Sequence, residues 1–365
     1  MSERVRALGL AAPREPRFFE SELPPAGEGQ FRVETVFTGL SAGTELTYYK
    51  GTNPYLHAAF DEEYGVFREG RPGAAYPVER LGYMEVGRVV ESRSAAVEPG
   101  QLVAMAYGHR TAHVADAARE RFVVLPDDVD PLLGVYVAHM GPICANGLLH
   151  AAAELAHGEV RALGAGVEGR HVVVVGAGVV GLVTALFAAE HGAAAVAVVD
   201  PSSSRLAAAE KLGLRGVPER PDVWQGFKDE WAHAPRDRGA DLVFQCRGRA
   251  ASLALALRCL RPQGTVVDLA FYQDAAEAVR LGEEFHHNGL TIRCAQISRV
   301  PRGLGPAWSR DRLSGETIEL LRRRGPAMRK ALISDVLPLD EAPRLFAQLA
   351  AREREVLQAV FTVSA

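Results

Sequence analysis

Apolar positions in the middle of the chain follow the alternation of buried strands with helices. Residues 172–175 are four consecutive valines, and a continuous apolar run of this kind predicts a parallel strand covered on both faces. A glycine-rich turn follows, and then an alanine-rich apolar segment at 182–191 that predicts a helix. The next apolar run, 194–199, predicts a second strand and ends at Asp200. The pattern therefore predicts a βαβ unit of an α/β protein.

The same alternation continues on both sides of this unit. An alanine-rich helix is expected before it, at 148–163, and another helix after it, at 250–260. Three further strands are expected at 241–246, 264–270 and 290–296. Elements in this order predict a doubly wound parallel sheet, whose ligands bind outside the carboxyl ends of the strands.

The first part of the chain lacks this alternation. Short apolar runs separated by Pro and Gly predict a mostly antiparallel β domain, with strands at 31–37, 87–91, 101–105 and 121–125. Residues 48–76 carry Tyr, His, Phe and acidic residues between glycines, and they predict a long loop. Loops of that length without structure of their own are usually functional.

The last part of the chain is expected to return to the first domain. Helices are predicted at 315–324 and 339–352, and a final strand at 357–363. The expected organisation is a β-rich domain at 1–145, a nucleotide-binding α/β domain at 146–298 and a C-terminal return at 299–365.

Composition and charge narrow the class of protein. A chain of 365 residues is longer than a single hydrophobic core usually serves, which predicts two domains. Its content of 48% hydrophobic and 24% charged residues is ordinary for a globular protein. A net charge of −4 argues against a nucleic-acid partner. No apolar run approaches the about 20 residues that span a bilayer, and no leader-like apolar core stands at the N-terminus, so no membrane partner and a cytoplasmic location are expected. The four cysteines form no C-x-x-C pair, which predicts reduced thiols.

The glycine-rich turn carries the chemistry of a dinucleotide site. Gly176, Gly178 and Gly181 give G-x-G-x-x-G between the strand and the helix. The first glycine permits the tight turn, the second lets the backbone approach a pyrophosphate, and the third allows the helix to pack closely on the strand. Asp200 follows Gly178 at the distance where a carboxylate receives the adenosine ribose hydroxyls.

Three further motifs stand outside the glycine-rich turn: Gly-Leu-Ser-Ala-Gly-Thr-Glu at 39–45, Gly-Tyr-Met-Glu-Val-Gly at 82–87 and Glu-Phe-His-His-Asn-Gly-Leu at 284–290. With these motifs and the order of its elements, the whole chain resembles the medium-chain dehydrogenase/reductase superfamily. Asp200 with Arg205 is similar to the acid and base that hold the adenosine ribose in NAD-dependent members. The resemblance implies a GroES-like catalytic domain, a Rossmann domain, a small-molecule substrate and a homodimer that pairs through the edge strand at 290–296.

Together with the strand ends, this resemblance assigns the cofactor site. NAD(H) is expected ahead of NADP(H), because a carboxylate at Asp200 would accept from a 2′-hydroxyl and repel a 2′-phosphate. The predicted cofactor-binding residues are Gly176, Gly178, Val179, Val180, Gly181, Asp200, Arg205, Arg247, Gly248, Ala270 and Phe271.

The zinc ligands of the superfamily are not matched. Catalytic zinc needs a thiolate, an imidazole and a third Cys or acid, with one position left open for the substrate. The cysteine position holds Ala42, the His-Glu pair is replaced by Tyr83 and Met84, and the third position falls within 140–142, which offers no good ligand. No zinc is therefore expected, although His139 and Cys144 flank the third position and keep a non-standard site open.

Without a metal, a side chain must stabilise the charge on the reacting oxygen. Tyr83 is the predicted proton donor, because it replaces a zinc-binding histidine; the alternative is that it fills the volume of the metal site. Thr44 matches the hydroxyl of the superfamily that relays the proton, or it closes its own turn. Glu45 is expected to be structural, bonding backbone amides or an arginine. Predicted substrate contacts are Tyr48, His57 and Trp308.

These features predict a zinc-independent oxidoreductase that transfers a hydride between NAD(H) and a secondary alcohol or ketone. Three alternatives stay open. One is an NADPH-dependent, zinc-less enoyl or quinone reductase, and another is an epimerase or lyase that keeps NAD tightly bound. The third is a non-catalytic nucleotide-binding protein.

Overall fold

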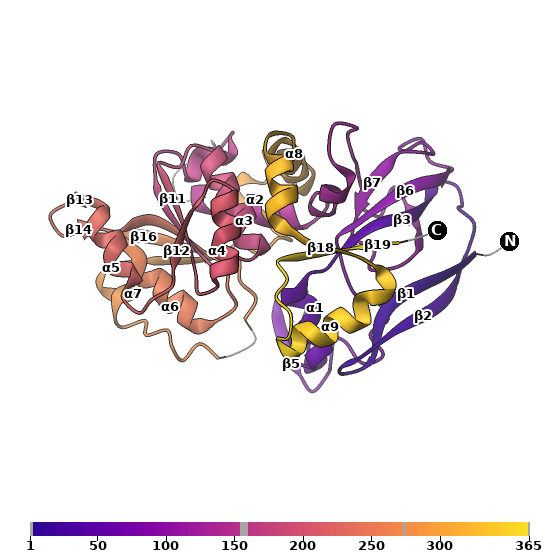
Figure 1. The fold of residues 1–365 in the computed structure, drawn as a ribbon, viewed down its shortest axis with the longest axis horizontal. Helices are drawn as coiled ribbons and strands as arrows, with labels where there is room; N and C mark the ends of the chain where they lie inside the picture. Colours follow the sequence, from indigo (N-terminus) through magenta and orange to yellow (C-terminus); the bar gives the residue numbers. More distant parts are fainter. Residues whose placement is uncertain (1–2, 154–159, 273–274, 364–365) are drawn as a thin grey trace. The chain divides into compact units, whose positions relative to one another are not determined.

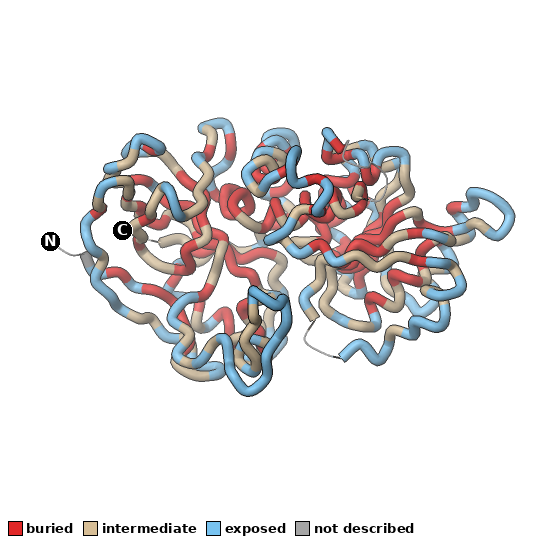
Figure 2. The backbone as a smooth tube through the Cα atoms, turned by 180° about the vertical axis from the view of Figure 1, so that it is seen from behind, coloured by how far each residue is buried: buried red, intermediate tan, exposed pale blue. Residues whose placement is uncertain are grey.

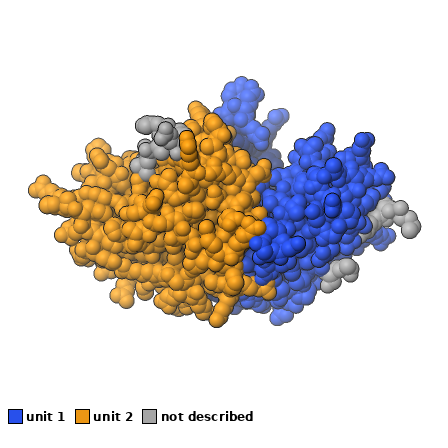
Figure 3. Space-filling view, turned by 90° about the horizontal axis from the view of Figure 1, so that it is seen from above, with its two compact units in different colours: residues 1–139, 333–365 blue, residues 140–332 orange. Residues whose placement is uncertain are grey.

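The computed structural model describes residues 3–153, 160–272 and 275–363, which divide between two compact units (Figure 3). Unit 1 comprises residues 1–139 and 333–365, and unit 2 comprises residues 140–332. The chain thus changes unit at 139/140 and 332/333, whereas the sequence placed these changes at 145/146 and 298/299.

Unit 2 is built on a parallel sheet of six strands in the order β12-β11-β10-β15-β16-β17. Every pairing is parallel, and the order reverses between β10 and β15. This is the doubly wound topology that the sequence predicts. The strands are β10 (His171–Val175), β11 (Ala195–Asp200), β12 (Arg215–Pro218), β15 (Ala240–Gln245), β16 (Leu260–Asp268) and β17 (Thr291–Cys294).

The valine run forms the centre of this sheet. Residues 172–175 lie in β10, and all four side chains are fully buried. Figure 2 shows buried residues along these strands, as an all-parallel sheet with both faces covered requires.

Helices pack against one another in two groups around the sheet (Figure 1). The first group is α2 (Met140–Ala152), α3 (Val179–Glu190), α4 (Ser203–Lys211) and α8 (Arg310–Leu332). The second is α5 (Val223–Glu230), α6 (Ala250–Cys259) and α7 (Glu284–His287). Unit 2 also contains η3 (Leu163–Gly166), η4 (Arg302–Leu304) and the hairpin of β13 (Ala232–Ala234) and β14 (Asp237–Arg238).

Two helices of unit 2 differ from their predicted extents. The helix expected at 148–163 is α2, which begins earlier; residues 154–159 of that prediction lie outside the described residues. The helix expected at 315–324 is α8, which continues through Pro326. Within the described ranges, no helix combines the length and apolarity needed to cross a membrane.

Unit 1 contains a seven-stranded sheet in the order β18-β19-β3-β6-β7-β9, with β8 also paired to β3. The pairings of β3 with β6, β8 and β19 are antiparallel, and β18 pairs with β19 in parallel. Its strands are β3 (Gln30–Gly39), β6 (Glu85–Ser92), β7 (Leu102–Met105), β8 (Ala112–Asp116), β9 (Val123–Val124), β18 (Ile333–Pro338) and β19 (Gln358–Thr362).

The remaining elements of unit 1 lie around this sheet. An antiparallel hairpin opens the described chain, formed by β1 (Glu3–Ala12) and β2 (Glu15–Leu23). The helices are α1 (Ala42–Lys50), η1 (Pro54–Leu56), η2 (Pro131–Tyr136), η5 (Leu339–Glu341) and α9 (Ala342–Ala351).

The segment at 48–76, expected to be a loop, has local structure. It contains the end of α1, the 3-10 turn η1 and a small hairpin of β4 (Ala58–Asp61) and β5 (Val66–Glu69). The hairpin is missed because its strands have only four residues each, and because the glycines around them resemble loop punctuation.

Candidate functional site

The glycine-rich turn of unit 2 has the geometry that its three glycines predict. Gly176 follows β10 with φ +107°, a left-handed conformation that L side chains rarely adopt. A Cβ at Gly181 would lie 1.8 Å from the Gly176 carbonyl oxygen, so only glycine lets α3 approach the strand this closely. A Cβ at Gly178 would meet nothing within 4 Å, which leaves open space beside the N-terminus of α3. A phosphate is favoured there, because free backbone N–H groups and the helix dipole attract anions.

Asp200 joins two of the loops at this edge of the sheet. Its carboxylate is 3% exposed, and its two oxygens accept from the backbone N–H groups of Ala177, at 2.8 Å, and Ser202, at 2.9 Å. A carboxylate has about four lone-pair positions, so each oxygen can accept one further hydrogen bond from a ribose hydroxyl. Arg205 lies in the first turn of α4, where its N–H donates to Ser202 Oγ.

The loops after β15 and β16 lie against the same turn. A Cβ at Gly176 would be 3.1 Å from Arg247 Cβ, and Arg247 forms a 2.8 Å ion pair with Glu219, which follows β12. A Cβ at Gly248 would meet the Phe271 carbonyl oxygen at 2.3 Å. The Ala270 N–H donates to the Asp268 carboxylate, and burial raises the pKa of that carboxyl. The predicted cofactor residues therefore occupy loops or first helical turns at the carboxyl ends of neighbouring strands, and they fit a dinucleotide.

In unit 1, Tyr83 belongs to a cluster of hydroxyl groups. Its phenol oxygen is hydrogen-bonded to Ser41 Oγ and lies 3.5 Å from Thr44 Oγ1. The His139 ring packs against the Tyr83 ring, with 4.6 Å between centroids. Ser41 is the N-cap residue of α1, yet its hydroxyl makes no capping bond because it is used on Tyr83. Two hydroxyls and one imidazole thus lie around a single phenol.

A buried network of charged and polar side chains supports Ser41. Glu45 accepts from the Ser41 backbone N–H at 2.6 Å through Oε1, and from His109 Nε2 at 2.7 Å through Oε2. His109 Nδ1 lies 2.6 Å from Thr38 Oγ1, which donates to Glu85 Oε1 at 3.0 Å. Glu45, His109, Thr38 and Glu85 are each no more than 2% exposed.

Donor and acceptor roles in this network define the charge of His109. Thr38 Oγ1 gives its one proton to Glu85, so it accepts from His109 Nδ1–H, while the Glu45 carboxylate accepts from Nε2–H. With Glu45 and Glu85 as carboxylates, this pattern places a proton on each ring nitrogen, which is the imidazolium form. Burial opposes this charge, but Glu45 and Glu85 outweigh it and raise the pKa of His109. Burial also raises the pKa of Glu85, although four hydrogen bonds to its oxygens favour the carboxylate.

The positions that bind zinc in the superfamily offer no suitable ligand set. Ala42 has no donor atom, Met84 is fully buried beside Gly39, and Tyr83 is engaged with Ser41. Cys144 belongs to unit 2, where its thiol donates to the Val180 carbonyl oxygen at 3.5 Å. The residues at these positions therefore do not fit a tetrahedral zinc site.

The three predicted substrate contacts are distributed over both units. Tyr48 lies on α1 one turn after Thr44, and its pKa is raised by burial and by Tyr55 and Tyr76. His57 is exposed at the end of η1. Trp308 is buried within unit 2, and its indole N–H donates to the Val160 carbonyl oxygen at 2.7 Å. Its polar group is therefore occupied by the backbone.

Sequence reasoning missed Ser41 and the role of His109. Ser41 stands in the Ser-Ala-Gly-Thr-Glu motif, directly before Ala42, so its position in a matched motif was an available signal. His109 lies 64 residues from Glu45, and nothing in the local sequence announces that they pair. Glu45 is structural, as expected: it bonds a backbone amide, and its charged partner is a histidine rather than an arginine.

Comparison with known proteins agrees with the fold. The family model described as zinc-binding dehydrogenase matches residues 179–303. The chain is 27% identical to D-guloside 3-dehydrogenase of Escherichia coli K12 over 94% of its own length and 95% of that protein.

Two solved structures share the whole fold. A zinc-binding dehydrogenase of Sinorhizobium meliloti 1021 bound to NADP matches with a TM-score of 0.73 at 19% identity, over 99% of both chains. An alcohol dehydrogenase of Thermotoga maritima matches with a TM-score of 0.72 at 19% identity, over 99% of this chain and 100% of that one. Residues 179–303 thus match the zinc-binding dehydrogenase family, and over nearly its whole length the chain is similar to medium-chain dehydrogenases of the zinc-type alcohol dehydrogenase branch; it is an oxidoreductase that depends on a nicotinamide cofactor.

Proposed function

We propose that the protein interconverts a secondary alcohol and a ketone with NAD(H), and that Tyr83 takes the place of catalytic zinc. The observation that carries the proposal is the convergence of Ser41 and Thr44 on the phenol of Tyr83, at a position where relatives of the superfamily bind the metal. A bound nicotinamide supplies or accepts the hydride; the chain must then manage the charge on the substrate oxygen.

Tyr83 neutralises the charge on the substrate oxygen by acting as a general acid. In the reducing direction its O–H proton passes to the carbonyl oxygen while the hydride bonds to the carbonyl carbon. The phenolate left on Tyr83 is stabilised by the hydrogen bond from Ser41 Oγ–H, and Thr44 Oγ1, 3.5 Å away, is the second hydroxyl available to return a proton. In the oxidising direction the same groups remove the alcohol proton.

Asp200 supports NAD(H) over NADP(H). Its carboxylate is fixed by the Ala177 and Ser202 amides, which leaves it aimed at the ribose position with acceptor capacity and negative charge. The pairing of Arg247 with Glu219 points the same way, because a guanidinium already bound to a carboxylate is less free to receive a 2′-phosphate.

A ring hydroxyl of a sugar derivative is the first substrate class to test. The relative that covers 94% of the chain is named D-guloside 3-dehydrogenase, which supports a secondary alcohol on a pyranoside ring.

We also propose that the protein forms a homodimer through β17, which is the edge strand of the parallel sheet. Light scattering can measure the oligomeric state of the protein.

Replacing Tyr83 by Phe tests the proton donor. General acid catalysis contributes about 10²–10⁴-fold, so Tyr83→Phe should lower kcat by that factor while the affinity for NADH is unchanged. Tyr64→Phe is the matched control, because Tyr64 is 68% exposed in the turn between β4 and β5 and should leave kcat as it is. Equal activity of the parent and Tyr83→Phe would remove Tyr83 from the mechanism.

Two further measurements test metal independence and cofactor choice. Activity should survive prolonged dialysis against a strong chelator; loss that is restored by zinc would reinstate a catalytic metal. Fluorescence titration should show tighter binding of NADH than of NADPH. Preference for NADPH, with activity on conjugated carbonyl compounds, would favour the enoyl or quinone reductase alternative.

A further inference from the structure

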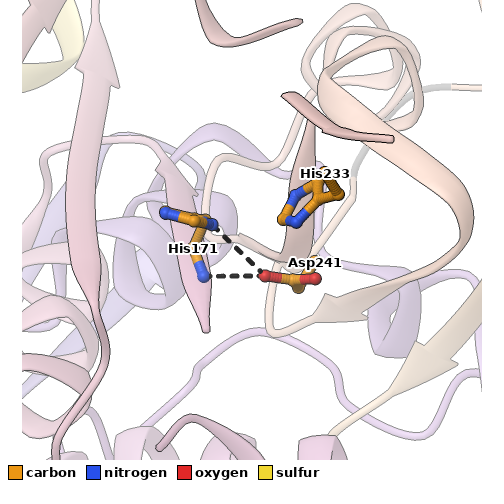
Figure 4. A group of neighbouring side chains, drawn as sticks. All are labelled: His171, His233 and Asp241. Atoms are coloured by element: carbon orange, nitrogen blue, oxygen red, sulfur yellow. Dashed lines mark hydrogen bonds and ion pairs between the residues drawn. The ribbon is translucent and has the colours of Figure 1, made fainter. Parts of the chain in front are cut away.

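Three side chains with metal-binding atoms meet at the amino end of the parallel sheet in unit 2 (Figure 4). His171 is the first residue of β10, His233 lies in the β13–β14 hairpin, and Asp241 is near the start of β15. One candidate ligand atom from each lies within 4.8 Å of the other two. Nothing in the proposed oxidoreductase chemistry uses this group.

The two histidines are arranged to offer lone pairs. His233 Nε2 lies 3.0 Å from the Gly239 carbonyl oxygen, which can only accept, so Nε2 carries the proton and Nδ1 keeps the lone pair in the neutral ring. A metal-binding histidine usually donates its other N–H to a backbone carbonyl in this way. His171 Nδ1 is buried and has no hydrogen-bond partner among the described residues. The His171 ring stacks on Trp231, with 5.0 Å between centroids, which fixes its plane.

The third side chain, Asp241, supplies a charged oxygen. Its Oδ2 accepts from the His171 backbone N–H at 2.8 Å and lies 3.6 Å from His171 Nδ1. Its Oδ1 accepts from Arg261 at 2.6 Å.

The charges around Asp241 are mixed, so the geometry of the ligand atoms and not the net charge favours a metal ion. Arg261 also pairs with Asp237, so one guanidinium is shared by two carboxylates. Of the three side chains, Asp241 also lines a pocket of 780 Å³, together with Asp237 and Arg261. Arg170 and Arg236 line the same pocket, and they would favour an anion such as hydroxide or chloride as a further ligand of the ion.

We propose that His171, His233 and Asp241 bind a divalent transition-metal ion of the zinc class. Zinc bonds of about 2.0–2.1 Å place tetrahedral ligands about 3.4 Å apart, and His171 Nδ1 and Asp241 Oδ2 are already 3.6 Å apart. All three candidate ligand atoms lie within 4.8 Å of one another, so the separations that involve His233 must shorten by about 1.4 Å at most to reach the same geometry. It is exposed on a hairpin of two short strands, so a side-chain rotation can achieve this.

The location gives the ion a structural role. The site is at the amino end of β10, and the glycine turn is at the carboxyl end, about 16 Å away for five residues of parallel strand. An ion here would fasten the β13–β14 hairpin to β10 and β15 without touching the cofactor edge. Its binding should raise thermal stability and leave the cofactor affinity unchanged, so this inference stands or falls separately from the proposed function.

Titration calorimetry with zinc chloride tests the site on the full chain after removal of metal by a chelator. The parent should bind one zinc ion with a rise in Tm, and His233→Ala and His171→Ala should each weaken binding at least 10-fold. His287→Ala is the matched control, because His287 lines the same pocket but is outside the cluster, and it should bind zinc like the parent. Cobalt in place of zinc should give the visible absorption of a tetrahedral site in the parent and not in His233→Ala.

Two results would overturn the proposal. One is the absence of stoichiometric zinc binding by the parent. The other is zinc affinity that is the same in the parent, His233→Ala and Asp241→Asn, since the ion would then be held elsewhere. Because His233 is exposed, its replacement should leave the fold intact, which the near-ultraviolet circular dichroism of the metal-free variant can verify.

Discussion

Replacing Glu45 by Gln should destabilise unit 1 and change how its free energy of unfolding depends on pH. The carboxylate accepts from the Ser41 amide with one oxygen and from His109 with the other, and both partners are buried. The carbonyl oxygen of glutamine can serve only one of them. The other partner then faces an N–H₂ group that donates instead of accepting.

The expected magnitude follows from the burial of the pair. Breaking a buried ion pair by altering one partner costs about 3–5 kcal/mol, because a buried charge is left uncompensated. At roughly 2–4 °C per kcal/mol for a unit of this size, the Tm of unit 1 should fall by about 6–20 °C. Urea unfolding followed by circular dichroism, together with differential scanning calorimetry, measures both quantities.

The pH dependence gives a second signature of the same pair. Because His109 has a raised pKa in the folded state, its contribution to stability is complete below about pH 6.5, the value for an unfolded histidine, and is lost as the pH rises through the folded pKa. In Glu45→Gln the carboxylate that favours the imidazolium is gone. The decline of the free energy of unfolding above pH 6.5 should therefore be flatter than in the parent.

Glu20→Gln provides the control, since it makes the same chemical change in an exposed pair. Arg4 and Glu20 are 3.9 Å apart with side chains 84% and 61% exposed, and this variant should stay within about 0.5 kcal/mol of the parent. If Glu45→Gln unfolds at the same temperature and with the same pH profile as Glu20→Gln, the buried pair of Glu45 and His109 does not stabilise unit 1.

The nucleotide turn yields two further predictions. Gly181→Ala places a Cβ 1.8 Å from the Gly176 carbonyl oxygen, so α3 must shift and NADH affinity in a fluorescence titration should fall more than 10-fold; Gly178→Ala enters open space and should keep the Tm of the cofactor-free protein. In the parent, the Ala177 and Ser202 amides each donate to a different oxygen of the Asp200 carboxylate. Asp200→Asn keeps only one acceptor oxygen, so one amide loses its partner, and the negative charge is removed as well. NADH affinity should fall about 10-fold, or 1.4 kcal/mol, while NADPH affinity falls less, and an unchanged ratio of the two would argue against Asp200 as the ribose reader.

The features predicted well from sequence are those governed by local rules. Four adjacent valines are typical of a strand that is buried on both faces, and in the structure they form β10, where all four are buried. The glycine positions were assigned by backbone requirements within six residues, and Gly176 and Gly181 meet those requirements in the structure. Local spacing was sufficient because each of these constraints is set within one βα unit.

The features that escaped prediction depend on distant partners or on competing local signals. Glu45 and His109 are separated by 64 residues, and only the sheet of unit 1 brings them together. The helix predicted at 315–324 is followed in the sequence by Gly325 and Pro326, which are residues typical of a helix end. In the structure both lie inside the helix, and Gly325, Met328 and Leu332 are buried, so packing overrides the local preference.

The sheet of unit 1 is assembled from two ends of the chain, and this constrains the order in which the protein can fold. β3 pairs with β19, a strand separated from it by all of unit 2, and Val360 and Phe361 of β19 are fully buried. During synthesis from the N-terminus, unit 2 is a continuous segment that can fold as soon as it emerges. On the edge of β3 that β8 pairs over residues 30–34, residues 37–39 must wait unpaired until β19 appears. An unpaired edge of this kind invites association with other chains, so the nascent protein is most prone to aggregate in the interval before β19 is released.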